Sequence, residues 1–414
     1  MYHLIFIIPY FLILLFQFKK HKGFTPLSIL LILVIFSNIS CLIIFPEFQI
    51  ETLEDLQITL YTFIILSGML LPFYLFNGIK SVIAIPLNKL NRLTRFVYFF
   101  GSIGFILTLV TALVSIFLFR SISVNISEYK NGEVGQELLE NILPESIFTI
   151  MGFTMAFSFI ALALHFYFLS QNQLKKSFFP FIISLTIPLK SLQEFSRGGL
   201  VMFIGLYVMT YLLLRNAIPK KILKQFKNKL RIISILVLSV FLFITLNRFQ
   251  EKSYNDNEMN PALVSIFEYA GQWNKNSLQV LKNYDDSKNM SGSRFKYLPR
   301  RIDRFLGNKV IDQGDIDKNT FGNLASAFRG LVSNLVYDLG YLGTLVFVIF
   351  FIFLCRIAKP NKNREIRLQQ IIYFILLSFI CIFFFRGNLF VLSYFSFAVL
   401  ITIFLNLYIK LKWR

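Results

Sequence analysis

The chain has 414 residues, of which 56% are hydrophobic and 15% are charged, and its mean hydropathy is +0.63. Soluble domains usually carry about 25% charged residues, so this composition excludes an ordinary soluble domain and indicates a membrane protein. The formal net charge of +20 would suit a nucleic-acid-binding protein. The distribution of the basic residues along the chain favours a different explanation.

Apolar segments of about 20 residues can cross the hydrocarbon core of a membrane as helices. The sequence predicts eleven such spans: 2–18, 26–45, 56–76, 96–119, 147–169, 178–193, 199–214, 232–247, 335–355, 368–385 and 389–409. The first is followed by lysines and lacks a small-residue cleavage site, which favours a retained span over a signal peptide. The expected fold is an all-α, polytopic membrane protein.

Lysine and arginine concentrate in the cytoplasmic loops of membrane proteins. Alternate connections hold 24 of the 42 basic residues and one of the 22 acids: 19–22, 80–95, 175–176, 215–231, 356–367 and 410–414. This alternation predicts an N-terminus outside the cell and a cytoplasmic C-terminus. It also explains the net charge by contact with anionic lipid, so no nucleic-acid partner is expected.

A long polar segment, 248–334, separates the first eight spans (1–247) from the last three (335–414) and is expected on the outer side. Structureless loops of this length are uncommon, so we expect short helices that form a cap. Asn260 followed by Pro261 predicts the start of one helix. Its aromatic residues Tyr269 and Trp273 suit core packing better than sugar stacking, although both remain open.

A second part of this loop is basic and amphipathic. Apolar residues recur at helical spacing over 294–307, and cationic side chains lie between them: Arg294, Lys296, Arg300, Arg301 and Arg304. Such a helix can lie on a membrane surface with its charges toward lipid phosphates. A cap helix with a solvated face explains the pattern equally well.

Metal and cofactor sites are not expected. Asp312, Asp315 and Asp317 fit an acidic surface turn better than the twelve-residue calcium loop. The cysteines, Cys41, Cys355 and Cys381, lie in or beside apolar runs and predict buried thiols. None of the three histidines, His3, His21 and His165, falls in 248–334, which argues against a Ser-His-Asp hydrolase or His-ligated zinc on the outer face.

The turn between the sixth and seventh predicted spans carries ionisable residues that are expensive at membrane depth. Lys190 and Glu194 are four residues apart and can pair on one helix face. Ser196, Arg197 and Gly198 follow, at the start of the next span. An arginine beside a helix N-terminus suits phosphate binding. An interfacial arginine with structural glycines is the alternative.

The approach to the ninth predicted span is the other candidate site. Asp338 is the one acid within 335–355, and it needs a partner in an apolar environment. Arg329 is the nearest cation in sequence; an aspartate that caps the span is the alternative interpretation. Arg386, between the last two spans, is a further cationic candidate or a snorkelling turn residue.

These motifs resemble those of the O-antigen, or oligosaccharide repeat-unit, polymerases of the Wzy type. That family also has many spans and a large outer loop late in the chain, and a Ser-Arg-Gly turn opens a mid-chain span, as at Ser196–Gly198. An Asn-Thr segment then precedes an Asp-x-Gly-x-x-Gly re-entry, here Asn319–Thr320 and Asp338–Gly343. With ten residues between them, the glycine expected after Arg197 would occupy position 208, which is Val208 instead.

The resemblance implies a metal-independent glycosyltransferase of the bacterial inner membrane, as in lipopolysaccharide synthesis. It would transfer a growing glycan from undecaprenyl pyrophosphate to the non-reducing end of another lipid-linked unit. The implied partners are lipid-linked oligosaccharide, membrane lipids and a chain-length regulator. The residues that would bind phosphate are Arg197 and Arg329, with a secondary group of Ser196, Gly198, Arg294, Arg300, Arg301, Arg304 and Arg386; Asp338 or Glu194 would be the base.

Two rival functions remain. A flippase or exporter of lipid-linked oligosaccharide is expected to have charges lining a central cavity and no large outer loop. An O-antigen ligase shares the general plan but uses a histidine in the large loop, which this chain lacks.

Overall fold

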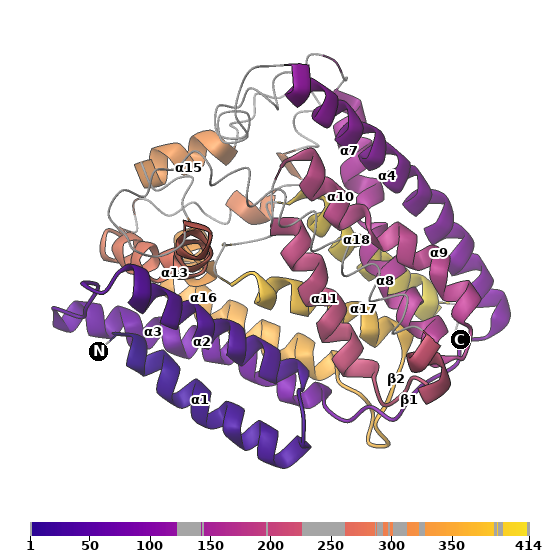
Figure 1. Cartoon of the computed structure of the whole chain (residues 1–414), viewed down its shortest axis with the longest axis horizontal. Helices are drawn as coiled ribbons and strands as arrows, with labels where there is room; N and C mark the ends of the chain where they lie inside the picture. Colours follow the sequence, from indigo (N-terminus) through magenta and orange to yellow (C-terminus); the bar gives the residue numbers. More distant parts are fainter. Residues whose placement is uncertain are drawn as a thin grey trace. The chain divides into compact units, whose positions relative to one another are not determined.

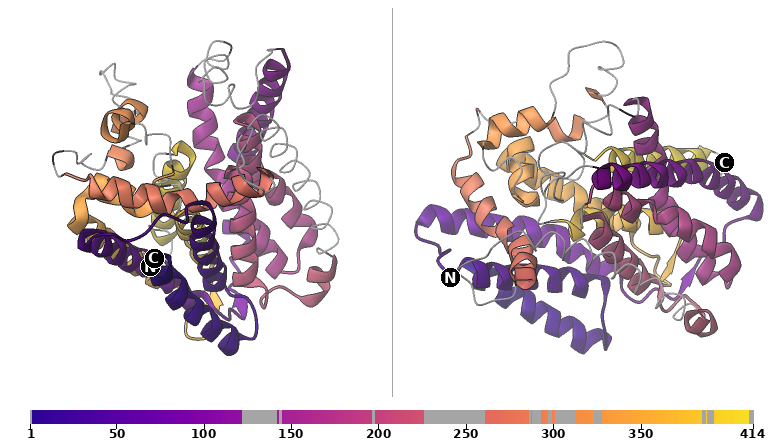
Figure 2. Two further views of the ribbon diagram at one scale, coloured as in Figure 1. Left: turned by 60° about the vertical axis from the view of Figure 1, so that its left-hand side comes forward. Right: turned by 45° about the horizontal axis from the view of Figure 1, so that its top comes forward.

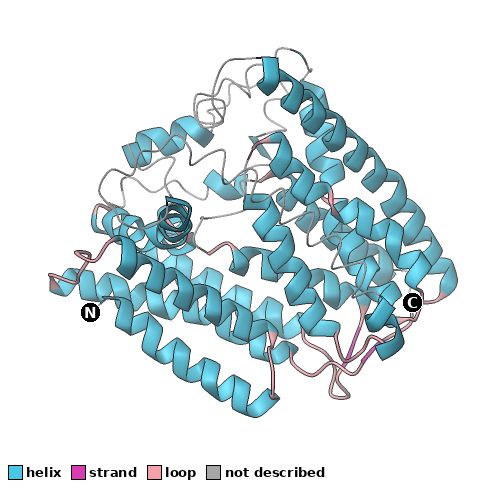
Figure 3. Ribbon diagram, in the orientation of Figure 1, coloured by secondary structure: helices cyan, strands magenta, loops and turns pink. Residues whose placement is uncertain are grey.

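A computed structural model describes residues 2–121, 142, 145–195, 198–225, 261–285, 287, 293–296, 299–300, 313–322, 328–384, 387 and 392–411. Most of these residues are helical, and two short strands accompany the helices (Figure 3). The chain forms two compact units. The first combines Met1–Asn77, Leu263–Lys359 and Leu377–Ser396, and the second combines Gly78–Ala262, Pro360–Leu376 and Phe397–Arg414.

Six helices of the described ranges are long and apolar enough to cross a membrane: His3–His21, Pro26–Ile44, Leu53–Phe76, Leu87–Phe119, Ser146–Ser170 and Leu331–Ala358. Shorter apolar helices cover Gly198–Leu214, Leu368–Ile382 and Tyr394–Leu405. A predominantly helical chain with several helices able to cross a membrane, as the composition predicts, is therefore confirmed, and the count of eleven spans stays a prediction. The predicted span 232–247 lies outside the described residues.

In the first unit, α1 (Tyr2–His21), α2 (Pro26–Ile44) and α3 (Leu53–Leu70) pack side by side, and the 3₁₀ helix η1 (Leu71–Phe76) continues α3 (Figure 1). Capping boxes start α2 and α3. The Thr52 hydroxyl accepts from the Asp55 amide at 3.1 Å, and the Asp55 carboxylate accepts from the Thr52 amide at 3.1 Å. These side chains satisfy amides that the first helical turn leaves without partners.

The helix predicted at Asn260–Pro261 is α13 (Pro261–Lys282), and it packs against α2 (Figure 2). Gly271 permits the contact, because a Cβ atom there would lie 2.5 Å from the backbone nitrogen of Cys41. Trp273 is 1% exposed. Its indole N–H donates to the Ser37 hydroxyl, which donates in turn to the Ala270 carbonyl at 2.6 Å. Trp273 is therefore a packing residue and not a surface for sugar stacking.

Two shorter helices of the loop follow, η3 (Ser293–Lys296) and α15 (Gln313–Phe321). The acidic turn expected around Asp315 and Asp317 is wrong, since α15 carries both. Asp312 lies outside the described residues, and the predicted helix over 294–307 is described only in part. The three cysteines are free and buried, as predicted.

The second unit contains α4 (Leu87–Ser121), α7 (Glu145–Met155), α8 (Phe157–Ser170), α9 (Leu174–Ser184), α10 (Thr186–Gln193) and α11 (Gly198–Leu214). α8 packs against α9, and α4 packs against α7 and α10. Predicted span 178–193 is not one helix but α9 and α10, which meet at Leu185. Pro188 explains the break, because proline has no amide hydrogen to donate to the carbonyl of Ser184, four residues earlier, and its ring clashes with that carbonyl. Helices α17 (Leu368–Ile382) and α18 (Ser393–Leu411) contribute to both units.

A parallel pair of two-residue strands joins two loops of the second unit. Strand β1 (Ser81–Val82) pairs with β2 (Glu365–Ile366), and the Lys80 amide donates to the Arg364 carbonyl at 2.8 Å. Strands this short have no alternating pattern, so the sequence did not predict them. Both loops belong to the set expected in the cytoplasm, and the side of the membrane on which they lie stays a prediction.

We predict that Gly271→Ala destabilises the protein by about 1–3 kcal/mol, because the added methyl group cannot fit between α13 and the backbone of α2. The measurement is thermal unfolding of the detergent-solubilised chain. The control is Gln272→Ala, at the next, half-buried position of α13. Equal stability of both variants would show that Gly271 is not a close contact.

Candidate functional site

The approach to the ninth predicted span is a separate short helix. The helix α16 (Leu331–Ala358) is interrupted at Gly340, whose φ of 72° and ψ of 172° are not helical. Gly330, immediately before α16, has φ 80° and ψ 162°. Only glycine adopts such conformations at little cost. The two glycines therefore bracket a short helix, 331–339, and residues 331–338 are buried.

Arg329 lies at the beginning of this short helix. Its side chain is 6% exposed, and its guanidinium carbon lies 3.8 Å from the ring centroid of Phe321, at the end of α15. This is a cation–π arrangement. The carbonyl of the neighbouring Phe328 accepts a hydrogen bond from the side-chain nitrogen of Asn276 at 3.0 Å, which connects this segment to α13.

Trp273 supports the turn at Gly330. A Cβ atom on Gly330 would lie 2.7 Å from Cε3 of the indole. The Leu331 amide donates to the Phe384 carbonyl at 2.6 Å, and the Phe384 ring packs edge-on against Trp273 with centroids 5.3 Å apart. Gly387 approaches the same helix, since its Cβ would lie 2.6 Å from the Asn334 side-chain nitrogen. Arg386 itself lies outside the described residues.

Asp338 lies near the other end of the short helix and is 1% exposed. At 1.5 Å per residue, it is about 10 Å along the axis from Leu331. The Ser293 hydroxyl donates to its Oδ1 at 3.5 Å, and Arg300 donates to the Ser293 carbonyl at 2.7 Å. The basic segment of the loop therefore approaches this carboxylate. The pairing of Asp338 with Arg329 stays a prediction.

A row of aromatic rings runs beside the short helix. Phe321 and Tyr337 have centroids 4.7 Å apart, Tyr337 and Tyr284 are 4.9 Å apart, and Tyr284 and Tyr341 are 5.4 Å apart. Tyr61 of α3 packs edge-on against Tyr341 at 5.0 Å and donates to its carbonyl at 2.7 Å. Tyr337 is buried and the other four rings are half-buried. The row was not predicted, because its members come from distant segments.

The other candidate turn belongs to the second unit. Lys190 and Glu194 form the predicted ion pair, with Nζ and Oε1 3.2 Å apart, and the Glu194 side chain is 48% exposed. Gly198 begins α11, and Gly199 packs tightly on α10, where its Cβ would lie 2.5 Å from the Ser191 hydroxyl. The glycines thus have a packing role. Whether they also shape a phosphate site stays a prediction.

Several candidate residues lie outside the described part of the chain, or their side chains do. They are Ser196, Arg197, Arg301, Arg304, Arg386 and the side chain of Arg294. Within the described ranges, no cluster of three His, Cys, Asp or Glu residues could hold a metal ion.

No protein-family model, curated protein or solved structure matches the chain. Function must therefore be inferred from the chain's own residues. In the first unit, a buried guanidinium and a buried carboxylate occupy the two ends of one short helix, next to aromatic rings. A guanidinium suits phosphate, and a carboxylate can accept a proton from a hydroxyl.

We predict that Gly330→Ala costs at least about 1 kcal/mol more stability than Gly322→Ala. Both glycines have positive φ, 80° and 53°, but the Cβ of Gly322 would meet nothing within 4 Å, whereas that of Gly330 would overlap Trp273. Thermal unfolding in detergent measures the difference. Trp273→Phe should reduce the extra cost of Gly330→Ala, because the smaller ring leaves room. Strictly additive effects would contradict the proposed contact.

Proposed function

We propose that the chain is a polymerase of lipid-linked oligosaccharide repeat units, built on eleven spans and working on the outer side of the cytoplasmic membrane. It would transfer the growing glycan from undecaprenyl pyrophosphate to the non-reducing end of another lipid-linked unit. The observation that carries the proposal is the short helix 331–339. It holds buried Arg329 near one end and buried Asp338 near the other.

The reaction needs stabilisation of a leaving pyrophosphate and a proton acceptor. A sugar hydroxyl of the acceptor attacks the anomeric carbon of the donor, and the bond from that carbon to the pyrophosphate oxygen breaks. The hydroxyl proton passes to a carboxylate, and the departing diphosphate carries the bonding electrons. Arg329 and Arg197 would compensate the charge that develops on the leaving group, and this role needs no metal ion.

Asp338 is the better candidate for the base. Glu194 is half exposed and its carboxylate is held by Lys190. Asp338 is 1% exposed, and its Oδ1 accepts a long hydrogen bond of 3.5 Å from the Ser293 hydroxyl. A carboxylate shielded from bulk water can meet a sugar hydroxyl without competition from solvent. Arg300, through Ser293, would help to hold this arrangement.

We predict that Arg329→Gln and Asp338→Asn each abolish polymerisation and leave single repeat units on the lipid acceptor. Arg329→Lys should retain part of the activity, because lysine keeps the charge but loses the bidentate geometry. The measurement is a gel of surface polysaccharide from a deletion strain that expresses each variant. Lys318→Gln, at an exposed cation on α15, is the control and should give the normal ladder.

Membrane levels of each variant must match the wild type. A long-chain ladder from both Arg329→Gln and Asp338→Asn would contradict the proposal. A defect that leaves no unit at all on the acceptor would point to a flippase or a ligase instead.

A further inference from the structure

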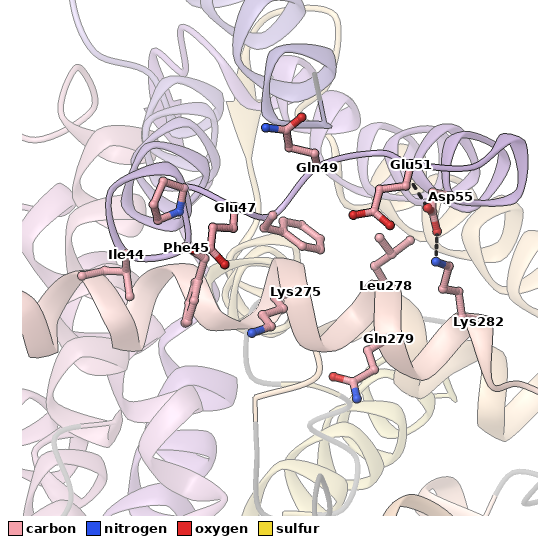
Figure 4. A pocket seen from close by; sticks show the side chains of 12 residues that line it. Ile44, Phe45, Glu47, Gln49, Glu51, Asp55, Lys275, Leu278, Gln279 and Lys282 are labelled. Carbon is pink, nitrogen blue, oxygen red and sulfur yellow. Dashed lines mark hydrogen bonds and ion pairs between the residues drawn. The ribbon is translucent and has the colours of Figure 1, made fainter.

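A groove lies between α13 and the connection from α2 to α3, and the proposed reaction does not use it. Its volume is about 560 Å³, within the range of about 300–1,000 Å³ typical of small-molecule sites. Figure 4 shows Glu47 and Glu51 extending from the connection toward α13, which contributes Lys275, Gln279 and Lys282.

The groove offers hydrogen-bonding groups over an apolar floor. Phe48 and Leu278 form part of the lining and belong to one hydrophobic cluster. Glu47, Glu51 and Gln279 are exposed and present carboxylate and amide oxygens. Within the described ranges, neither Glu47 nor Glu51 has an ion-pair partner. These groups can accept hydrogen bonds from hydroxyls, and the Gln279 amide can also donate.

One end of the groove is fixed by a strong ion pair. Lys282 Nζ lies 2.6 Å from Oδ1 of Asp55, whose side chain is 2% exposed. Hydrogen bonding to Asp55 raises the pKa of Lys282 above its usual 10.5, so the pair stays charged at neutral pH. At the other end, Lys275 Nζ lies 5.1 Å from the ring centroid of Phe45. Lys282 is thus paired, and the ionisable groups left exposed in the groove are Glu47, Glu51 and Lys275.

The groove is continuous with the aromatic row. The core cluster of Ile58, Leu278, Leu281 and Val336 carries Phe48 on its edge together with Tyr61, Tyr284 and Tyr341. Leu278 lines the groove, and Val336 belongs to the short helix. A continuous set of aliphatic side chains and aromatic rings therefore connects the groove with Phe321 and Arg329.

We propose that this groove binds sugar rings of the lipid-linked glycan that lie beyond the reacting sugar, and so holds the chain during elongation. Sugar rings present hydroxyls that match carboxylate and amide groups and C–H faces that pack on aromatic rings. Phosphate fits the groove less well than a neutral sugar, since Glu47 and Glu51 would repel it and Lys282 is already paired with Asp55. The inference rests on the proposed function for the identity of the glycan, but its binding test does not depend on catalysis.

The test uses the full chain in nanodiscs and, as probe, the free oligosaccharide repeat unit released by mild acid from the host's own polysaccharide. The groove variant is Glu47→Ala with Glu51→Ala and Gln279→Ala. Loss of two or three hydrogen bonds at about 1 kcal/mol each should weaken binding about tenfold or more. The matched control, Asn283→Ala, changes an exposed residue immediately after α13 that does not line the groove and should bind normally.

Arg329→Gln should bind the probe as the wild type does, although it forms no polymer. The groove variant should still polymerise but give shorter chains, because the glycan leaves sooner. Wild-type affinity in the groove variant, or no binding of the oligosaccharide by the wild type, would overturn the inference. Binding of a cationic peptide such as polylysine in place of the oligosaccharide would overturn it too. If the wild type forms no polymer while the groove variant alone loses the probe, the proposed function fails and the glycan site stands.

Discussion

The contact between Trp273 and Gly330 is the constraint on which the candidate site depends. The indole is buried between α2 and the short helix 331–339, and it leaves no room for a side chain at Gly330. The turn at Gly330 therefore needs glycine. This turn sets the position of Arg329, which directly precedes it. Because Ser37 accepts from the indole N–H, the position of Trp273 is set by a membrane-spanning helix. Within the first unit, α13 and α2 are thus joined to the short helix through this side chain.

The two glycines at the ends of the short helix explain how charged residues are held in a protein that spans a membrane. Gly340 ends the helix by its positive φ, so that the following span begins in a new direction. Buried Asp338 precedes this break, and buried Arg329 precedes Gly330. Ionisable residues near the membrane are costly unless they have a partner or a function. Here the aromatic ring of Phe321 and the hydroxyl of Ser293 supply local support.

Three features were predictable from local signals. Apolar length predicted the long helices, the Asn-Pro pair predicted the start of α13, and the four-residue spacing predicted the Lys190–Glu194 ion pair. The apolar run 178–193 was predicted as one helix, although Pro188 is a local signal for the break between α9 and α10. The turn predicted at Asp315 and Asp317 was wrong, because three acids near a glycine resemble a turn although α15 carries two of them. The row from Phe321 to Tyr61 and the groove beside Phe48 depend on contacts between segments more than 200 residues apart in sequence (Tyr61 and Tyr341). No periodicity could reveal them.

The central claim is that this chain alone joins lipid-linked repeat units on the outer side of the cytoplasmic membrane. Its most direct test is reconstitution of the purified chain in vesicles with repeat units linked to undecaprenyl pyrophosphate. The account predicts one free undecaprenyl pyrophosphate for each new glycosidic bond, without added metal ion or any other protein. Release of no carrier lipid, with the glycan left as single units, would contradict it.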